Sequence, residues 1–233
     1  MLGIEDIDIA VGALKEAAAA TARDFGAEDV AGEEDFSGQL IGRLKGTIDF
    51  LKTPHARWHV GAAIGPDDVP AVSTVRFSGR QMGPKGRGSE ETWSGADLLL
   101  VLEIRTPNYE IRKGVLVQAK RLESGRSLPS DGVLRLKSQC RDMLDLSAAS
   151  FVFLYARTDL TVISATAVEG SDRRDLHALV QFSDSTCVFL SDFLKCWIGD
   201  PRLTATDRES LAVLRALARA RNALLIKAEQ TSV

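Results

Sequence analysis

Apolar and polar positions near the start of the chain recur with a helical period. Residues 4 to 25 form an Ala-rich segment with acids near its beginning and Gly26 directly after its end, a pattern typical of a helix with a glycine stop. A second helix is predicted over residues 33 to 51, where Thr53-Pro54 would end it. Two helices are therefore expected before any strand.

The middle of the chain changes to short apolar runs, which are typical of β-strands. The runs cover residues 57–64, 71–77, 96–104, 114–120, 150–156 and 160–168. Later helices are predicted over residues 134–146, over part of 187–198 and from a capping box at Thr206 and Glu209 to about residue 227. This order predicts an α/β (α+β) fold in which helices flank a central mixed β-sheet.

The chain has 233 residues, which suits one domain over 1–233. We expect an N-terminal helix within 1–28, a core over about 33–165 and a helical C-terminal extension over about 186–230. The first residues carry acids where a secretory signal carries bases, and no apolar run reaches the length of a membrane span. The sequence thus predicts a soluble cytoplasmic protein with no membrane partner.

Charge is unevenly distributed behind a formal net charge of −3. The first 50 residues hold an excess of acids, whereas residues 76–126 hold an excess of bases. A local excess of bases favours a phosphate-bearing partner, with a solvated basic loop as the alternative. Residues 78–88 are interpreted as a mobile loop, and we expect its Arg80, Lys85 and Arg87 to contact a phosphate backbone.

Three glycines recur at four-residue spacing along the second predicted helix, at Gly38, Gly42 and Gly46. Each glycine costs about 1 kcal/mol of helix stability relative to alanine, so the spacing predicts close approach by another backbone on that side. Glu34 stands one turn before Gly38 on the same side, and it is expected to lie near whatever the glycines contact.

Polar residues gather at one end of a predicted hairpin over residues 97–120. With its turn near Asn108, antiparallel pairing places Asp97 opposite Gln118 and Lys120. These last two residues are two apart and share one face of their strand. A lysine in an otherwise apolar strand must reach solvent, pair with a carboxylate or act on a ligand, because burying an unpaired charge is costly.

The tripeptide "GAD" at the start of one strand and "VQAK" at the end of the next resemble the PD-(D/E)XK nuclease superfamily, in the Q-x-K variant of Mrr-like restriction endonucleases. The resemblance covers about residues 33–165. It implies a restriction-endonuclease-like fold and an enzyme that hydrolyses DNA phosphodiester bonds with Mg²⁺ or Mn²⁺, in restriction or phage defence. The chain has Ala96 where the pattern has proline, and Gln118 where it more often has a carboxylate.

The resemblance also implies roles for individual residues. Asp97 would be the principal metal ligand, with Gln118 and the Ala119 carbonyl completing the protein ligands. Lys120 would orient the attacking water or stabilise the charge on the phosphate. Glu34 would supply the acid that the family takes from an early helix, chosen over its two acidic neighbours because it lies on the glycine side.

Two further residues complete the predicted site. Arg121 is expected to contact DNA, together with the basic residues of the 78–88 loop. Gln139 in "LKSQCRDML" resembles a glutamine that related nucleases place near the site, with an ordinary surface glutamine as the alternative.

Other interpretations remain open at the level of sequence. Lys120 and Arg121 could simply leave the strand end for water while Asp97 caps a turn, and Glu103 is expected to contact Arg105 or Arg112 across the hairpin. The chain could be a catalytically silent relative that binds nucleic acid or a partner. It could also be active only in a multi-subunit assembly or defence system, with the acidic N-terminal helix as docking surface, or as a homodimer.

Overall fold

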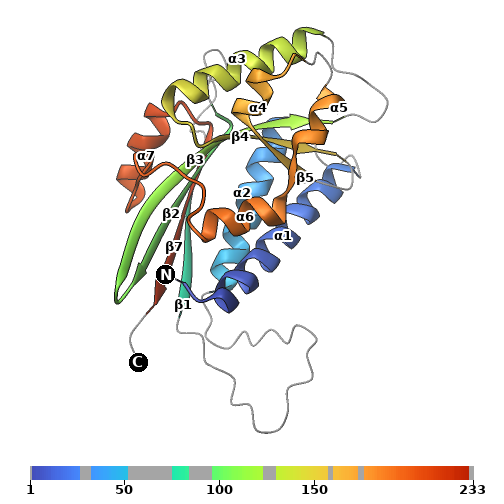
Figure 1. The fold of residues 1–233 in the computed structure, drawn as a ribbon. Helices are drawn as coiled ribbons and strands as arrows, with labels where there is room; N and C mark the ends of the chain where they lie inside the picture. Colours follow the sequence, from blue (N-terminus) through green and yellow to red (C-terminus); the bar gives the residue numbers. More distant parts are fainter. Residues whose placement is uncertain are drawn as a thin grey trace.

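A seven-stranded mixed β-sheet with helices on both faces forms the fold (Figure 1), which confirms the predicted α/β class. The structure is a computed structural model, and it describes residues 2–26, 33–51, 75–83, 96–122, 130–156, 160–172 and 176–230. In chain order its elements are α1 (Ile4–Gly26), α2 (Glu33–Phe50), β1 (Val75–Met82), β2 (Leu98–Thr106), β3 (Tyr109–Arg121), α3 (Ser130–Leu146), β4 (Ser150–Tyr155), β5 (Leu160–Ser164), α4 (Ala165–Gly170), α5 (Leu176–Leu179), a 3-10 turn (Val180–Phe182), β6 (Asp184–Ser185), α6 (Thr186–Leu194), α7 (Arg208–Leu217) and β7 (Asn222–Gln230).

The strands are ordered β1-β7-β2-β3-β4-β5-β6 across the sheet. Strand β2 runs parallel to β7, and β3 runs parallel to β4, whereas all other neighbours are antiparallel. The centre of the sheet therefore combines the β2–β3 hairpin with one parallel strand on each side of it.

Two apolar cores lie on the two faces of the sheet. The first core holds buried side chains of α1, α2 and α6 together with Leu98 and Val117 of the sheet. The second core holds buried side chains of α3, α4 and α7 together with Leu99 and Leu116. Adjacent strand residues enter different cores because side chains alternate between faces. Figure 1 shows the same arrangement of helices around the sheet.

The predicted C-terminal helix is wrong beyond residue 217. Helix α7 ends at Leu217, Arg219 takes a left-handed backbone conformation with φ of 50°, and residues 222–230 form β7 inside the sheet. The segment is rich in Ala, Leu, Lys and Glu, which favour helices in isolation. Strand β7 pairs with β1 on one side and with β2 on the other, and its first five residues are buried. This tertiary context overrides the local preference for a helix.

Two predicted boundaries also shift. The strand predicted over residues 160–168 ends at Ser164, whose hydroxyl accepts a hydrogen bond of 3.1 Å from the Ala167 N–H and starts α4. The capping box lies one residue later than predicted. Asp207 accepts from the Ser210 N–H at 2.8 Å, and Ser210 Oγ accepts from the Asp207 N–H at 3.1 Å.

The predicted loop over residues 78–88 is wrong in its first half, because residues 78–82 belong to β1. Arg80 is exposed on this strand, whereas Lys85 and Arg87 lie outside the described residues. The strand predicted at 57–64 also lies outside them, and of the run at 71–77 only the last three residues are described, as the start of β1.

Helices α1 and α2 match their predicted ranges within one residue, but no described backbone makes the close approach that was predicted at the α2 glycines. Apart from the backbone of the same helix, no described atom lies within 4 Å of the Cβ position at Gly38, Gly42 or Gly46. The helix instead packs through Phe36, Leu40 and neighbouring apolar residues on its other side. The described helices include no candidate for a membrane span, since none sustains the necessary apolar character over the necessary length.

Candidate functional site

The β2–β3 hairpin has a turn end and an open end. Pairing runs from Thr106 opposite Tyr109 to Leu98 opposite Val117, which confirms the predicted hairpin and its register. Strand β3 then continues to Arg121 alongside β4, four residues beyond the last pair with β2. At this open end the β2-facing side of β3 has no strand partner in the described residues.

Asp97 accepts a hydrogen bond from a backbone N–H of β3 that has no β2 residue opposite it. The Leu116 N–H donates to the Ala149 carbonyl just before β4, and the Leu122 N–H, just after β3, donates to the Tyr155 carbonyl. Because N–H groups alternate between the two edges of a strand, the N–H of Ala119 points toward β2. Asp97 Oδ2 accepts the Ala119 N–H at 2.9 Å, and it also accepts a hydrogen bond from Gln118 Nε2. Gln118 Nε2 lies 3.4 Å from the Ala119 carbonyl oxygen. Asp97, Gln118 and Ala119 therefore meet at one point, as the hairpin register predicts.

Gln118 is an incompletely satisfied buried amide. The residue is 3% exposed, and its Oε1 is buried without a hydrogen-bond partner among the described residues. Leaving a buried acceptor without a partner costs about 1–3 kcal/mol. Nε2 is the atom directed at Asp97, and a half-turn of the amide, which exchanges its oxygen and nitrogen, would turn Oε1 toward Asp97 instead. In that orientation the amide oxygen could accept a ligand together with the carboxylate.

Lys120 shares the face of Gln118. Their partners in β4 are Leu154 and Val152, both in the second core, whereas Val117 of β3 is buried in the first core. Lys120 is half-buried near the end of the strand. The prediction that Gln118 and Lys120 project from one face is thus confirmed.

Arg121 lies on the opposite face from Lys120. Its guanidinium carbon is 4.2 Å from the centre of the Phe25 ring at the end of α1, an arrangement suited to a cation–π contact. The side chain therefore contacts a ring of the first core and does not share a surface with Gln118 and Lys120.

Strand β7 brings two residues to the site that the predicted helix had placed elsewhere. Arg221 N–H donates to the Ala96 carbonyl and Asn222 N–H donates to the Asp97 carbonyl, each at 3.0 Å. With Leu98 paired to Asn222, the register places Arg221 beside Asp97. The continuous apolar run over residues 223–226 is typical of a buried parallel strand and could have indicated this.

For Glu34 and Gln139, the described structure shows no contact with Asp97 or Gln118. The side chain of Glu34 lies outside the described residues, and the glycine contacts that favoured it over Glu33 and Asp35 are absent among them. Helix α2 covers the first core, the face away from Gln118. Gln139 is half-buried in α3, one turn after Leu136 of the second core, so α3 lies on the Gln118 side of the sheet.

The donor atoms at this point are those that a hard divalent cation prefers. Mg²⁺ binds carboxylate, amide and backbone oxygens and keeps several waters. Asp97 supplies a carboxylate, Gln118 an unsatisfied amide oxygen and Ala119 a carbonyl at the open end. In the described ranges no three or more His, Cys, Asp and Glu residues come together as a metal site. The fit to Mg²⁺ thus rests on one carboxylate with neutral oxygens.

A second polar cluster lies near the turn end of the same hairpin. The Glu103 side chain is 2% exposed, and Oε1 accepts from Arg112 Nε at 3.1 Å while Oε2 lies 2.7 Å from Lys227 Nζ. Arg105 also lies 3.5 Å from Oε1, so both expected partners of Glu103 are present. Burial opposes the ionisation of Glu103, yet hydrogen bonds from Lys227 and Arg112 outweigh it and hold the pKa of Glu103 below its ordinary value.

Comparisons of this chain with family models, with curated proteins and with solved structures find no match. The nuclease resemblance therefore rests on the short motif and on the geometry of the open end.

Proposed function

We propose that the chain is a metal-dependent nuclease that hydrolyses phosphodiester bonds of DNA, in restriction or phage defence. One observation carries the proposal. Asp97 and Gln118 meet at the open end of a buried hairpin, and a polar atom of Gln118 has no partner among the described residues. Polar groups that serve only the fold are normally satisfied by hydrogen bonds, so this one is better explained by a ligand.

Each residue has a distinct part in this proposal. Asp97 and Gln118, with the Ala119 carbonyl, would hold Mg²⁺ or Mn²⁺. When bound, such an ion lowers the pKa of a coordinated water and offsets charge on a phosphate. The Ala119 N–H holds Asp97 Oδ2 in place, which orients the carboxylate before any ligand arrives. Lys120, on the same face, would donate to a non-bridging phosphate oxygen and stabilise the charge that grows there during cleavage.

Basic residues around the open end support a phosphate-bearing substrate. Lys120 lies near the end of β3 on the face of Gln118, and Arg221 precedes β7 beside Asp97. Arg215 donates to the carbonyl oxygens of Gly83 and Arg221, each at 3.0 Å. Within the described part of the open end, these bases outnumber the acid Asp97, and a local positive potential attracts polyanions. Exposed Arg80 on β1 would add a backbone contact to the same substrate.

Plasmid nicking by the full chain tests the proposal. The parent protein is expected to nick supercoiled DNA with Mg²⁺ or Mn²⁺ and to lose this activity in a chelator. Asp97→Asn should abolish nicking, because it removes the negative charge that would bind the metal ion. The asparagine keeps an oxygen that can accept the Ala119 N–H, so the local fold should be preserved. Glu110→Gln neutralises an acid near the turn end and serves as the matched control.

Metal binding provides a readout that does not depend on cleavage. A ligand that binds only the folded state raises the temperature of unfolding. Mn²⁺ should raise it for the parent and for Glu110→Gln but not for Asp97→Asn. Chelator-resistant nicking, or equal nicking by Asp97→Asn and the parent, would exclude the proposed role of Asp97. DNA binding with neither nicking nor a Mn²⁺ effect would identify a silent relative.

A further inference from the structure

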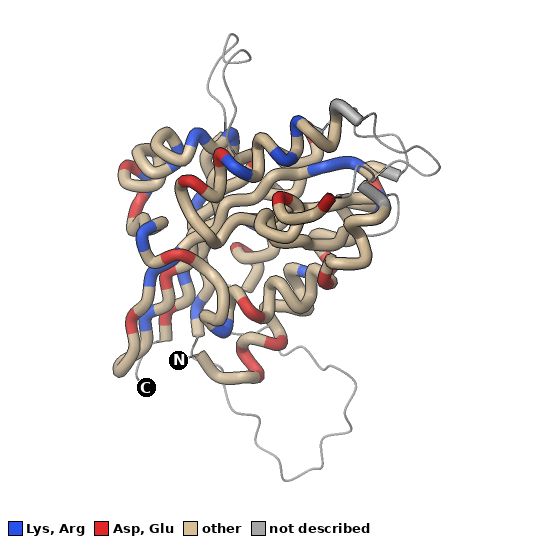
Figure 2. The backbone as a smooth tube through the Cα atoms, turned by 45° about the horizontal axis from the view of Figure 1, so that its top comes forward, with Lys and Arg blue, Asp and Glu red and all other residues tan. Residues whose placement is uncertain are grey.

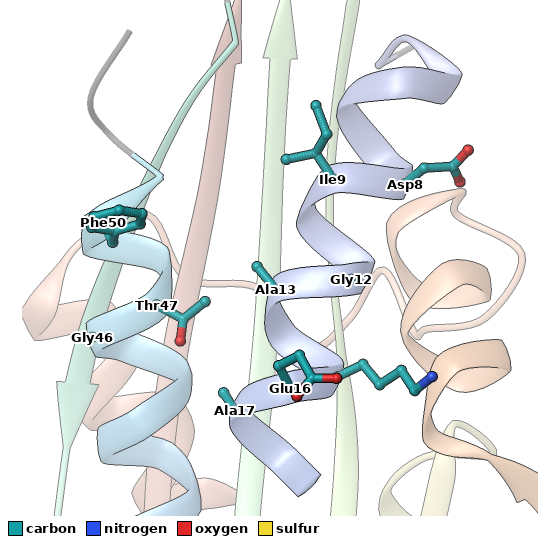
Figure 3. Close-up of a pocket in the computed structure, with 10 residues that line it drawn as sticks. Asp8, Ile9, Gly12, Ala13, Glu16, Ala17, Gly46, Thr47 and Phe50 are labelled. Carbon is teal, nitrogen blue, oxygen red and sulfur yellow. The ribbon is translucent and has the colours of Figure 1, made fainter. Parts of the chain in front are cut away.

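A groove of about 620 Å³ runs along the outer side of α1 beside the last turns of α2 (Figure 3). Ile9 and Ala13 of α1 face Thr47 and Phe50 of α2 across it, and the Phe50 side chain is exposed. The groove therefore joins two helices whose buried sides already fill the first core. It lies on the opposite face of the sheet from Gln118, so a role for the groove does not depend on the proposed nuclease function.

The glycines of these helices are not explained by packing within the described fold. Apart from the backbone of the same helix, no described atom lies within 4 Å of the Cβ position at Gly12, Gly42 or Gly46, and Gly12 and Gly46 line the groove. Glycine in the interior of a helix is unfavourable relative to alanine. Bare backbone beside an apolar groove allows another helix to approach closely, which a side chain at these positions would prevent.

The charges around the groove select among its candidate occupants. Helix α1, which forms one wall, carries five acids against two bases, whereas the acids of α2 lie at its far end or, in the case of Asp49, pair with Lys45. Asp8 and Glu16 lie on the rim with Lys15, and Figure 2 shows acidic positions along α1. A second copy would bring the same acidic helices together, and a fatty acid or anionic membrane would bring further negative charge, so like-charge repulsion disfavours all three.

We propose that this groove docks a basic amphipathic helix of a partner protein. The apolar side of that helix would cover Ile9, Ala13 and Phe50. Its backbone would pass close to Gly12 and Gly46, and its lysines or arginines would face Asp8 and Glu16. This arrangement uses the apolar walls, the bare backbone and the acidic rim together.

Two synthetic helical peptides of equal length serve as probes for the full chain. They share one apolar face of leucine and alanine, and their polar faces carry lysines in one and glutamates in the other. By fluorescence anisotropy, the lysine peptide is expected to bind about tenfold more tightly or better. Gly46→Leu, which places a side chain in the groove, should weaken that binding by about tenfold or more. Gly170→Leu is the matched control, because Gly170 of α4 also has open space at its Cβ position.

The melting temperature distinguishes a docking role of Gly46 from a structural role. Gly46→Ala is expected to raise the Tm by about 2–4 °C, because alanine is the better helix former. A fall in Tm would mean that the fold requires this glycine, which overturns the proposal. Equal binding of the two peptides, or undiminished binding by Gly46→Leu, overturns it as well. So does a dimer in light scattering that Gly46→Leu dissociates, since the occupant is then a second copy.

Discussion

The two ends of the β2–β3 hairpin carry polar clusters that differ in how completely they are satisfied. Near the turn end Glu103 is buried between Arg112, 3.0 Å from Oε1, and Lys227, 2.7 Å from Oε2, so a cation balances each oxygen although Oε2 makes no well-aligned hydrogen bond among the described residues. At the open end Asp97 is held by Ala119 and Gln118, but the amide of Gln118 keeps a buried atom without a partner among the described residues. Figure 2 shows acidic and basic positions side by side near the turn end.

This difference separates a cluster that stabilises the fold from one that suits a ligand. Breaking a satisfied buried ion pair leaves charges without partners, so its loss should reduce stability. Removing a group that is already unsatisfied should cost the fold little and should instead affect binding or catalysis. Both clusters lie on the second-core face of one sheet, and matched substitutions can therefore compare them directly.

The largest effect is expected at the open end for Lys120→Ala. If Lys120 stabilises charge on the reacting phosphate, the rate of Mg²⁺-dependent nicking should fall by about 10²–10³ while DNA binding largely survives. Arg105→Ala removes an exposed cation from the turn end and should leave the rate unchanged. Parent-like cleavage by Lys120→Ala would show that this lysine is a solvated strand end.

Glu103→Ala should mainly affect stability. It leaves Arg112 and Lys227 without their shared carboxylate, and because both are partly exposed we expect a loss of about 2–3 kcal/mol in the free energy of unfolding. Urea denaturation measures this loss, and Glu110→Ala, at a more exposed position, should cost less than about 1 kcal/mol. Equal losses in the two variants would contradict the distinction between buried and exposed acids.

The stability that Glu103 contributes should depend on pH in one direction. Its pKa is lower in the folded state than in the unfolded chain, so the contribution is present above the unfolded pKa and is lost as pH falls through the folded pKa. The difference in unfolding free energy between the parent and Glu103→Gln should therefore shrink from about pH 7 to about pH 3. A constant difference over that range would mean that ionisation of Glu103 is not what stabilises the fold.

The smallest effect on stability is expected for Gln118→Met. The variant loses a hydrogen bond to Asp97 but also removes an unsatisfied buried acceptor, so the free energy of unfolding should change by less than about 1 kcal/mol. The rise in Tm caused by Mn²⁺ should disappear, because a thioether is a poor ligand for a hard cation. Gln81→Met on β1 is the exposed control. A stability loss above about 2 kcal/mol would indicate that Gln118 has a structural partner.

Local patterns in the sequence were sufficient for the hairpin and for the point where its polar residues meet. Strand alternation and a turn near Asn108 determine which residues face one another, and these depend only on neighbours in the chain. The same is true of α1, α2 and β4, whose periodicity and end signals are local. The meeting of Asp97 with Gln118 was therefore predictable before any long-range contact was known.

The C-terminal strand was decided by the tertiary structure. The composition of residues 222–230 favours a helix in isolation, but β1 and β2 provide hydrogen-bonding partners on both edges of the strand. Its side chains also enter the two apolar cores on the two faces of the sheet. Because this segment is a strand, Arg221 lies beside Asp97 and Lys227 lies beside Glu103, so β7 contributes a base to each polar cluster of the hairpin. A local pattern could not have shown this, because the partners lie more than a hundred residues away in the sequence.

The α2 glycines and Gln118 likewise combine a feature that the sequence predicts with one that depends on the tertiary structure. Spacing alone marked Gly38, Gly42 and Gly46 as one side of a helix, but only the packed structure shows that this side faces away from the first core. Likewise the sequence places Gln118 on a strand face, whereas its burial, and the lack of a described partner for one of its polar atoms, result from the layers that close around it. Sequence determines the order of side chains along an element, and tertiary packing determines which of them water or a ligand can still reach.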